Sequence, residues 1–204
     1  MADNILQAQS AFPDISRHRY RGLTITVRDR LSLASIASAD GKSEQVSAAI
    51  QSAYGVQLPH RPMRVGDADI SFLWYGPNRW MAVSERNGGR ELETELQRHL
   101  GQLAAVVDHS DGRAVVRVSG ARTRDVLAKG LPIDLHPRVF KANDVALTHA
   151  SHIGVLIWQV DDAPTYDIAV PRSYAHSFCD WLLGAVEEFA VLESSFYAND
   201  KRSL

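Results

Sequence analysis

The chain has 204 residues, a formal net charge of −2 and 45% hydrophobic residues, values typical of a globular protein with a large core. Lysine and arginine are scattered rather than gathered in a stripe, so the composition does not favour nucleic-acid binding. The single cysteine, Cys179, excludes an intrachain disulfide and any multi-cysteine metal site. No apolar run approaches the ~20 residues that span a bilayer, and the first residues lack the pattern of a secretory signal. We therefore expect a cytoplasmic protein.

Two structural halves are expected, residues 23–103 and 104–190, between an N-terminal arm at 1–22 and a C-terminal tail at 191–204. The first ~20 residues and the last few, residues 199–204, show little periodicity, so we expect both ends to be loose unless a partner holds them. The first half is predicted to contain, in chain order, strands at 23–27 and 31–37 joined by a hairpin turn at Asp29-Arg30, a helix at 44–54 that Gly55 ends, strands at 70–75 and 80–84 around the turn Gly76-Pro77-Asn78, and a helix opened by Gly88-Gly89.

The second half repeats this order. Its predicted elements are strands at 106–107 and 114–118, a helix at 121–129 that Gly130 ends, a hairpin formed by 153–160 and 166–170, and a final helix that starts near Ser173. Gly41 and Gly120 lie 79 residues apart, and 80–83 and 167–170 lie 87 apart, which places like elements opposite each other. We therefore predict an α+β fold of two duplicated ββαββα units, with antiparallel sheets and helices on one face.

The segment Asp108-His109-Ser110-Asp111-Gly112 holds the densest group of polar side chains. Carboxylates beside an imidazole can form a general acid–base cluster. Asp and Ser before a glycine are also typical of a turn, where these side chains bind their own backbone, and we favour this interpretation. Asp111 and Arg113 can pair with each other or with a partner surface.

Other candidate sites are weaker. His149 and His152 are three residues apart beside strand-like sequence, where alternation sends them to opposite faces, so we expect no metal site. Cys179 lies on an amphipathic helix and is predicted to be a buried thiol. Trp80 is expected in the core, whereas Trp74 fits a core position and an interface position equally well. We predict no catalytic, cofactor-binding or metal-binding residue in this chain.

Four segments together resemble the γ subunit family of heterotetrameric sarcosine oxidases. They cover most of residues 70–185, in the same order as in the family. The segments are Trp74-Tyr75-Gly76-Pro77-Asn78-Arg79-Trp80, Asp108-His109-Ser110-Asp111-Gly112-Arg113-Ala114, Lys129-Gly130-Leu131-Pro132-Ile133-Asp134-Leu135-His136-Pro137 and Tyr166-Asp167-Ile168-Ala169-Val170-Pro171-Arg172-Ser173-Tyr174.

The resemblance implies a shortened relative of the aminomethyltransferase (glycine-cleavage T-protein) fold, in the form of its folate-binding domain. It also implies a complex that oxidises sarcosine to glycine with oxygen, giving hydrogen peroxide and a one-carbon unit for tetrahydrofolate. In such a complex the α subunit holds NAD and tetrahydrofolate, the β subunit holds FAD, FMN lies at the α–β junction and the δ subunit binds zinc. The γ subunit carries none of these groups.

The resulting hypothesis is a non-catalytic γ subunit that stabilises the complex, with direct packing on the α subunit and with the β and δ subunits as further partners. Candidate interface residues are Trp74, Arg113, Asp134, His136 and Arg138. The first alternative is a free-standing folate-binding protein or folate-dependent aminomethyltransferase, for which Asp108 and Asp111 are the acidic residues available to face a pterin. The second is the equivalent subunit of a complex that oxidises another N-methyl amino acid.

Overall fold

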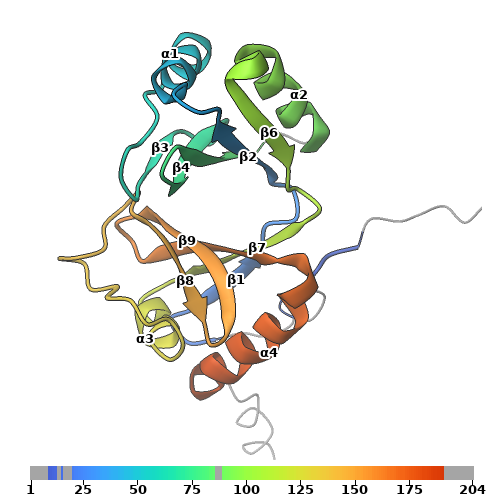
Figure 1. Cartoon of the computed structure of the whole chain (residues 1–204). Helices are drawn as coiled ribbons and strands as arrows, with labels where there is room; N and C mark the ends of the chain where they lie inside the picture. Colours follow the sequence, from blue (N-terminus) through green and yellow to red (C-terminus); the bar gives the residue numbers. More distant parts are fainter. Residues whose placement is uncertain (1–8, 13–14, 16–19, 86–88, 191–204) are drawn as a thin grey trace, which may run out of the picture.

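The computed structural model describes residues 9–12, 15, 20–85 and 89–190 (Figure 1). The elements follow in the order β1 (Thr24–Val27), β2 (Ser32–Ser38), α1 (Ser43–Tyr54), β3 (Arg64–Gly66), β4 (Ser71–Gly76), β5 (Arg79–Ser84), α2 (Gly89–Leu100), a 3₁₀ turn η2 (Gly101–Leu103), β6 (Ala104–Asp108), β7 (Arg113–Ser119), α3 (Thr123–Leu127), β8 (Val145–Ala150), β9 (Ile153–Asp161), β10 (Thr165–Pro171), η3 (Arg172–Tyr174), α4 (Ala175–Val186) and η4 (Glu187–Phe189).

Two antiparallel five-stranded sheets form the centre of the molecule. The first has the strand order β3-β4-β5-β2-β6 and the second β1-β7-β10-β9-β8. Helices α1 and α2 cover the outer side of the first sheet, and α3 and α4 cover the outer side of the second (Figure 1). The four layers are therefore helices, sheet, sheet, helices, which confirms the α+β class with helices on one face of each sheet.

Alternation along the strands explains this layering, because successive side chains point to opposite faces of a sheet. On β5, Trp80 and Ala82 pack under α1 and α2, whereas Met81 and Val83 face the second sheet. On β10, Ile168 packs towards α4 and Ala169 faces the first sheet. Both sheets are apolar on both faces, so their strands read as nearly continuous apolar runs.

The first strand of each unit lies in the sheet of the other unit. β1 pairs with β7, with Val27 opposite Val116, and β6 pairs with β2, with Val106 opposite Ile36. The predicted hairpin around Asp29-Arg30 is therefore wrong, since β1 and β2 belong to different sheets. Periodicity indicates which face of a strand is buried, but it carries no information on which strand lies beside it.

Each unit places its first strand in the sheet of the other unit, which supports the predicted duplication. The repeated unit is also longer than predicted. Each unit has the order ββαβββα, one strand more than predicted, because β3 and β8 were missed. β3 is only three residues long and β8 alternates weakly, with Leu147 and His149 exposed. The boundary between the halves at residue 104 stays a prediction, because β1 and β6 each cross to the opposite sheet.

Most local predictions agree with the structure. The helix at 44–54 is present as α1, and Gly55 ends it in the left-handed conformation at φ 69°, with its N–H donating to the carbonyl of Gln51. The hairpin of β4 and β5 turns at residues 77 and 78. No helix of the described residues is long and apolar enough to cross a membrane.

The N-terminal arm contributes to the core, against the expectation that it is loose. Phe12 and Ile15 are each 1% exposed and belong to the cluster that α4 covers. The ring of Phe12 lies 6.2 Å from that of Phe178 between centroids. Two apolar residues without periodic spacing give no secondary-structure signal, so the sequence pattern missed them. The C-terminal residues 199–204, which are predicted to be loose, lie outside the described residues.

Candidate functional site

Arg117 and Asp167 form a buried ion pair between the two sheets. They lie directly opposite each other on β7 and β10, and Nε and Nη2 of Arg117 each donate to one carboxylate oxygen at 2.7 Å. The Asp167 side chain is only 3% exposed. The hydrogen bonding to Asp167 raises the pKa of the Arg117 guanidinium. Such a fork-to-fork pair satisfies both charges, which is what burial of an ion pair requires.

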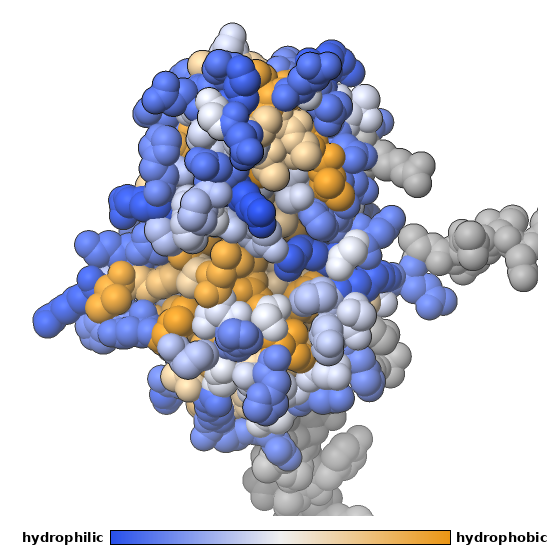
Figure 2. All heavy atoms as spheres, in the orientation of Figure 1, coloured by the Kyte–Doolittle hydropathy of each residue, from blue (hydrophilic) through white to orange (hydrophobic). Residues whose placement is uncertain are grey.

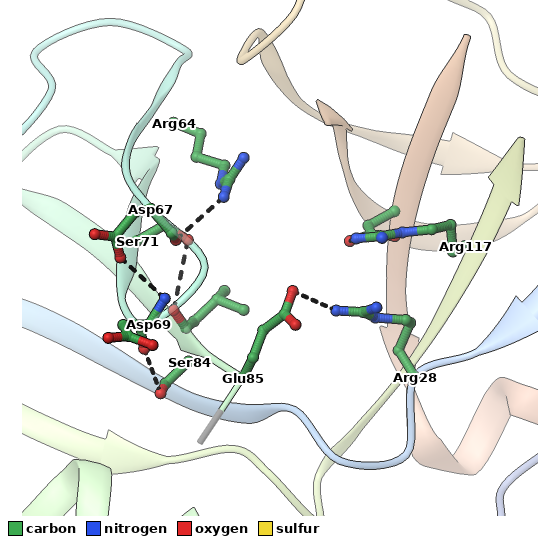
Figure 3. A network of polar contacts seen from close by, with 10 residues as sticks. Arg28, Arg64, Asp67, Asp69, Ser71, Ser84, Glu85 and Arg117 are labelled. Carbon is green, nitrogen blue, oxygen red and sulfur yellow. Dashed lines mark hydrogen bonds and ion pairs between the residues drawn. The ribbon is translucent and has the colours of Figure 1, made fainter. Parts of the chain in front are cut away.

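Two further arginines reach the same region from other elements (Figure 3). Arg28, in the β1–β2 connector, donates to Glu85 just after β5 at 2.6 Å. Arg64 on β3 donates to the carbonyl of Asp67 at 3.2 Å and to the side-chain oxygen of Asn143 at 3.4 Å. Burial lowers the pKa of Arg64, although the nearby Asp167 charge acts in the opposite direction.

These side chains surround a cavity of about 120 Å³, which we name the arginine cavity. It lies where the β1–β2 connector crosses between the sheets, so both sheets contribute to its walls. Its lining residues are Arg28, Leu31, Arg64, Asp67, Ala68, Ser71, Val83, Glu85, Arg117, Trp158, Val160 and Asp167.

The sequence interpretation missed the arginine cavity, although a signal for it exists. Arg117 interrupts the apolar strand Val115-Val116-Arg117-Val118, and Asp167 lies within Tyr166-Asp167-Ile168-Ala169. A charge inside a strand that is otherwise apolar is costly unless an opposite charge is beside it. The presence of one charge in each of these two strands therefore predicts that Arg117 and Asp167 form an ion pair.

The segment 108–112 shapes a connector, as favoured from the sequence. Oδ1 of Asp108 accepts from the backbone N–H of Ser110 at 3.0 Å and from its hydroxyl at 2.6 Å. The N–H groups of Gly112 and Arg113 both donate to the carbonyl of His109. The hydroxyl of Ser110 in turn accepts from the N–H of Leu33 on β2 at 3.0 Å. The polar side chains thus hold the β6–β7 crossing against the first sheet.

His109 lies against β2 rather than beside a carboxylate pair. Its Nε2 is 3.0 Å from the hydroxyl of Ser35. Burial lowers the pKa of His109, the positive charge of Arg113 acts in the same direction, and the Asp108 carboxylate opposes both. The burial of His109 therefore favours the neutral imidazole, which contacts the hydroxyl of Ser35.

The candidate interface residues fall into two groups. Arg113 binds Tyr75 through a hydrogen bond to the phenol oxygen and lies over its ring at 5.5 Å, and the neighbouring Trp74 is half-buried. Trp80 is 2% exposed and its indole N–H donates to the carbonyl of Pro59 at 2.9 Å, which confirms its core position. The sequence pattern predicts that Arg113 binds Asp111 or a partner surface. In the structure Arg113 instead binds Tyr75, which belongs to the other sheet.

The second group, Asp134, His136 and Arg138, lies on the exposed loop before β8. Oδ1 of Asp134 accepts from the N–H of His136 at 2.8 Å, and Nδ1 of His136 accepts from the N–H of Arg138 at 3.2 Å. Next to them Val139 is 60% exposed. Figure 2 shows apolar side chains gathered on the face that carries this loop, β8 and β9. An exposed apolar group with a polar rim is typical of an interaction surface.

The remaining candidates lie on α4, on β8 and in the turn that follows β8. Cys179 is a free, buried thiol on α4. His149 and His152 are both exposed. Among the residues that the structure describes, no three His, Cys, Asp or Glu side chains are close enough to hold a metal ion.

Comparison of the whole fold defines the class of protein. The structure superposes on the glycine cleavage system aminomethyltransferase T from Bartonella henselae with a TM-score of 0.57 at 16% identity, over 85% of this chain and 48% of that one. The duplicated double-sheet fold is therefore of the aminomethyltransferase type.

Within that class the sequence is more specific. Residues 38–188 match the model of the sarcosine oxidase, gamma subunit family. The chain is 35% identical over 147 residues to sarcosine oxidase subunit gamma of Corynebacterium sp. (strain P-1) and to that of an Arthrobacter species, covering 70% of each protein. A chain of the heterotetrameric sarcosine oxidase from Corynebacterium sp. U-96 superposes with a TM-score of 0.76 at 30% identity, over 86% of this chain and 89% of that one. This chain belongs to the sarcosine oxidase gamma subunit family.

Proposed function

We propose that this chain is the γ subunit of a heterotetrameric sarcosine oxidase and that it stabilises the complex without contributing a catalytic group. The observation that carries the proposal is the match, over nearly nine-tenths of both chains, to a chain of a heterotetrameric sarcosine oxidase. The polar clusters are consistent with it, since Asp108 and Ser110 bind each other in the β6–β7 connector and Arg117 and Asp167 bind each other within the second sheet.

In this proposal the cofactors lie on other subunits. FAD, FMN, NAD, tetrahydrofolate and zinc would be held by the α, β and δ subunits, and oxidation of sarcosine to glycine would take place there. The γ subunit would pack directly on the α subunit. Its contribution to activity is then indirect, through the stability of the assembly.

The loop before β8 is the surface that we assign to this packing. Val139 and Leu147 are 60% and 48% exposed, so the surface offers apolar contacts. Asp134 is engaged with the backbone N–H of His136, and Asp144 with that of Lys141. Arg138 and Lys141 form no ion pair among the described residues, so their charged groups are available to a carboxylate of a partner.

We therefore expect the facing surface of the α subunit to combine an apolar patch with carboxylates at its rim, since complementary charges orient association. Trp74 and Arg113 are proposed as a second contact. Arg113 can serve there through the guanidinium N–H groups that Tyr75 leaves free. Trp and Arg are enriched among residues that dominate binding.

Co-expression of this chain with α, β and δ subunits tests the proposal. A tag on this chain should recover flavin-bearing partners, and omission of this chain should reduce the yield of assembled complex. The isolated chain should produce no peroxide from sarcosine and should bind no reduced folate. Recovery of the tagged chain alone, together with saturable folate binding, would overturn the subunit role in favour of a folate-binding protein.

A charge reversal tests the surface separately. Arg138→Glu should weaken assembly at least tenfold, because it places a carboxylate against the acidic rim. Arg98→Glu, at an exposed position of α2 on the outside of the first sheet, is the matched control and should assemble normally. Equal assembly of both variants would leave the subunit role intact and show that another surface makes the contact.

A further inference from the structure

β8 forms one edge of the second sheet, and only its side towards β9 carries a complete hydrogen-bond ladder (Figure 1). The other side is paired for a short stretch by the segment that leads into β3. There Met63 forms an antiparallel bridge with Asp144, and the N–H of Val145 donates to the carbonyl of Pro62 at 3.2 Å. The first sheet therefore begins a second ladder along the outer side of β8.

Pro62 ends this second ladder. In a hydrogen-bonded antiparallel pair each residue donates to the other, but Pro62 has no N–H and cannot donate to the carbonyl of Val145. The next pair in the same register would join Leu147 with His60, and no backbone hydrogen bond connects these two residues. Because strand geometry repeats every second residue, the N–H and C=O groups of Leu147 and His149 point outward as those of Val145 do. Among the described residues these outward groups of Leu147 and His149 have no hydrogen-bond partner.

The open part of β8 lacks the protection that edge strands often have. Lysine and proline are common protecting residues at sheet edges, and Leu147-Thr148-His149 contains neither. At β6, the edge of the first sheet, the carboxylate of Glu93 on α2 instead accepts from the backbone N–H of Asp108 at 3.3 Å. On β8 the side chain beside the open backbone is Leu147, which is 48% exposed. The edge thus offers backbone donors and acceptors together with an apolar contact.

Charges at the Pro62 end of the open edge favour an acidic partner. Arg61 and Lys141 are both exposed and form no ion pair among the residues that the structure describes. Asp144, three residues after Lys141, is half-buried and accepts from the backbone N–H of Lys141. Two exposed cations therefore lie at this end, where a carboxylate of a partner segment can pair with them.

We propose that an extended segment of the α subunit adds to the second sheet along Val145–His149 and continues the ladder that Pro62 interrupts. Backbone hydrogen bonds would hold this strand, an apolar side chain would contact Leu147, and a carboxylate would lie near Arg61 and Lys141. Strand addition to an open sheet edge is a recurring mode of protein recognition. The inference rests on the proposed function, because β8 directly follows the loop that we assign to the α subunit, and it specifies how that subunit is bound.

Amide hydrogen exchange at single-residue resolution, on the isolated wild-type chain and on the assembled complex, tests the added strand. The N–H groups of Leu147 and His149 should exchange rapidly in the isolated chain and at least about tenfold more slowly in the complex, because they become hydrogen-bonded there. Ala146 and Thr148, whose N–H groups face β9, should exchange slowly in both states and are the internal control. Equal exchange of Leu147 and His149 in the two states would overturn the proposal.

A pair of variants tests the same backbone group. His149→Pro removes the outward N–H and leaves the ladder with β9 intact, so a tagged chain should recover about tenfold less α subunit. His149→Ala keeps the N–H and should recover as much as the wild type. Thermal unfolding of both isolated variants shows whether His149→Pro folds, and if it does not, the exchange measurement on the wild type decides.

Failure of strand addition is distinct from failure of the subunit role. If a folded His149→Pro chain recovers as much α subunit as His149→Ala, the strand addition is wrong, while the recovery itself still supports the subunit role. A wild-type chain that recovers no partner subunit would overturn the subunit role and, with it, this inference.

Discussion

Arg117 and Asp167 face each other across β7 and β10, joined by two N–H···O bonds of 2.7 Å. This pair occupies one end of the apolar layer between the sheets, where Trp158 and Val83 are also buried. Arg113, at the other end of β7, binds Tyr75 of the first sheet. Arg113 and Arg117 thus lie on the same face of β7, where Arg113 contacts the first sheet and Arg117 binds within its own sheet, and Val115 between them packs in the apolar layer.

Removal of one member of the pair should strongly destabilise the fold. Asp167→Ala leaves the Arg117 guanidinium without its carboxylate, and we expect a loss of about 3 kcal/mol in the free energy of unfolding. Denaturant unfolding measures the loss. The exposed pair of Arg122 and Asp125 is the control, with side chains 57% and 52% exposed. Asp125→Ala should change stability by about 0.5 kcal/mol or less, and a similar loss at both sites would contradict the assigned role.

His109 should make stability depend on pH. Its pKa in the folded chain is below the ordinary value of 6.5, so between those two values the unfolded chain binds more protons than the folded one. The free energy of unfolding should therefore fall as the pH is lowered through 6.5 and level off below the folded-state pKa. Unfolding curves between pH 7.5 and pH 5 would show a smaller decrease for His109→Gln, whereas His152→Gln, at an exposed position, should retain the wild-type slope.

Substitution of the two tryptophans of the β4–β5 hairpin should have different effects, with Trp80 affecting mainly stability and Trp74 mainly assembly with the partner subunits. Trp80→Ala removes a fully buried side chain and its hydrogen bond, with an expected cost of about 3–5 kcal/mol. Trp74→Ala, at a half-buried position, should cost about 1 kcal/mol but reduce recovery of the partner subunits. If Trp74→Ala is as unstable as Trp80→Ala, then Trp74 belongs to the core and its interface assignment fails.

A glycine pair tests the close approach of the β7–β8 connection to α4. A Cβ on Gly130 would overlap the indole of Trp181, whereas a Cβ on Gly154 of β9 would meet nothing within 4 Å. Gly130→Ala should destabilise the chain by about 1–3 kcal/mol through overpacking. Gly154→Ala should stay within about 0.5 kcal/mol of the wild type. Thermal unfolding of the two variants side by side measures the difference.

The N-terminal arm should contribute to stability through Phe12. This side chain is 1% exposed against Phe178, so Phe12→Ala should cost about 3 kcal/mol. Gln9→Ala, at an exposed position of the same arm, is the control and should have little effect. A Phe12→Ala chain as stable as the wild type would show that the arm does not anchor the second sheet.

The local elements of this protein could be predicted from its sequence. Spacing of Val46 and Ile50 with a terminal Gly55 defines α1, and alternation around Gly76-Pro77-Asn78 defines the β4–β5 hairpin. These patterns depend on neighbours within one turn or one strand, so the sequence carries them completely. The family resemblance likewise rests on short runs, and the comparisons confirm the family.

Only the tertiary structure decided which strands lie together. Asp29-Arg30 has the composition of a hairpin turn, yet the chain crosses there to the second sheet, because β1 gains its ladder from β7. The arginine cavity depends on the same exchange, since Arg28 comes from the crossing and Arg64 and Arg117 come from different sheets. Strand alternation determines buried faces, whereas the pairing of distant strands depends on packing of the whole core.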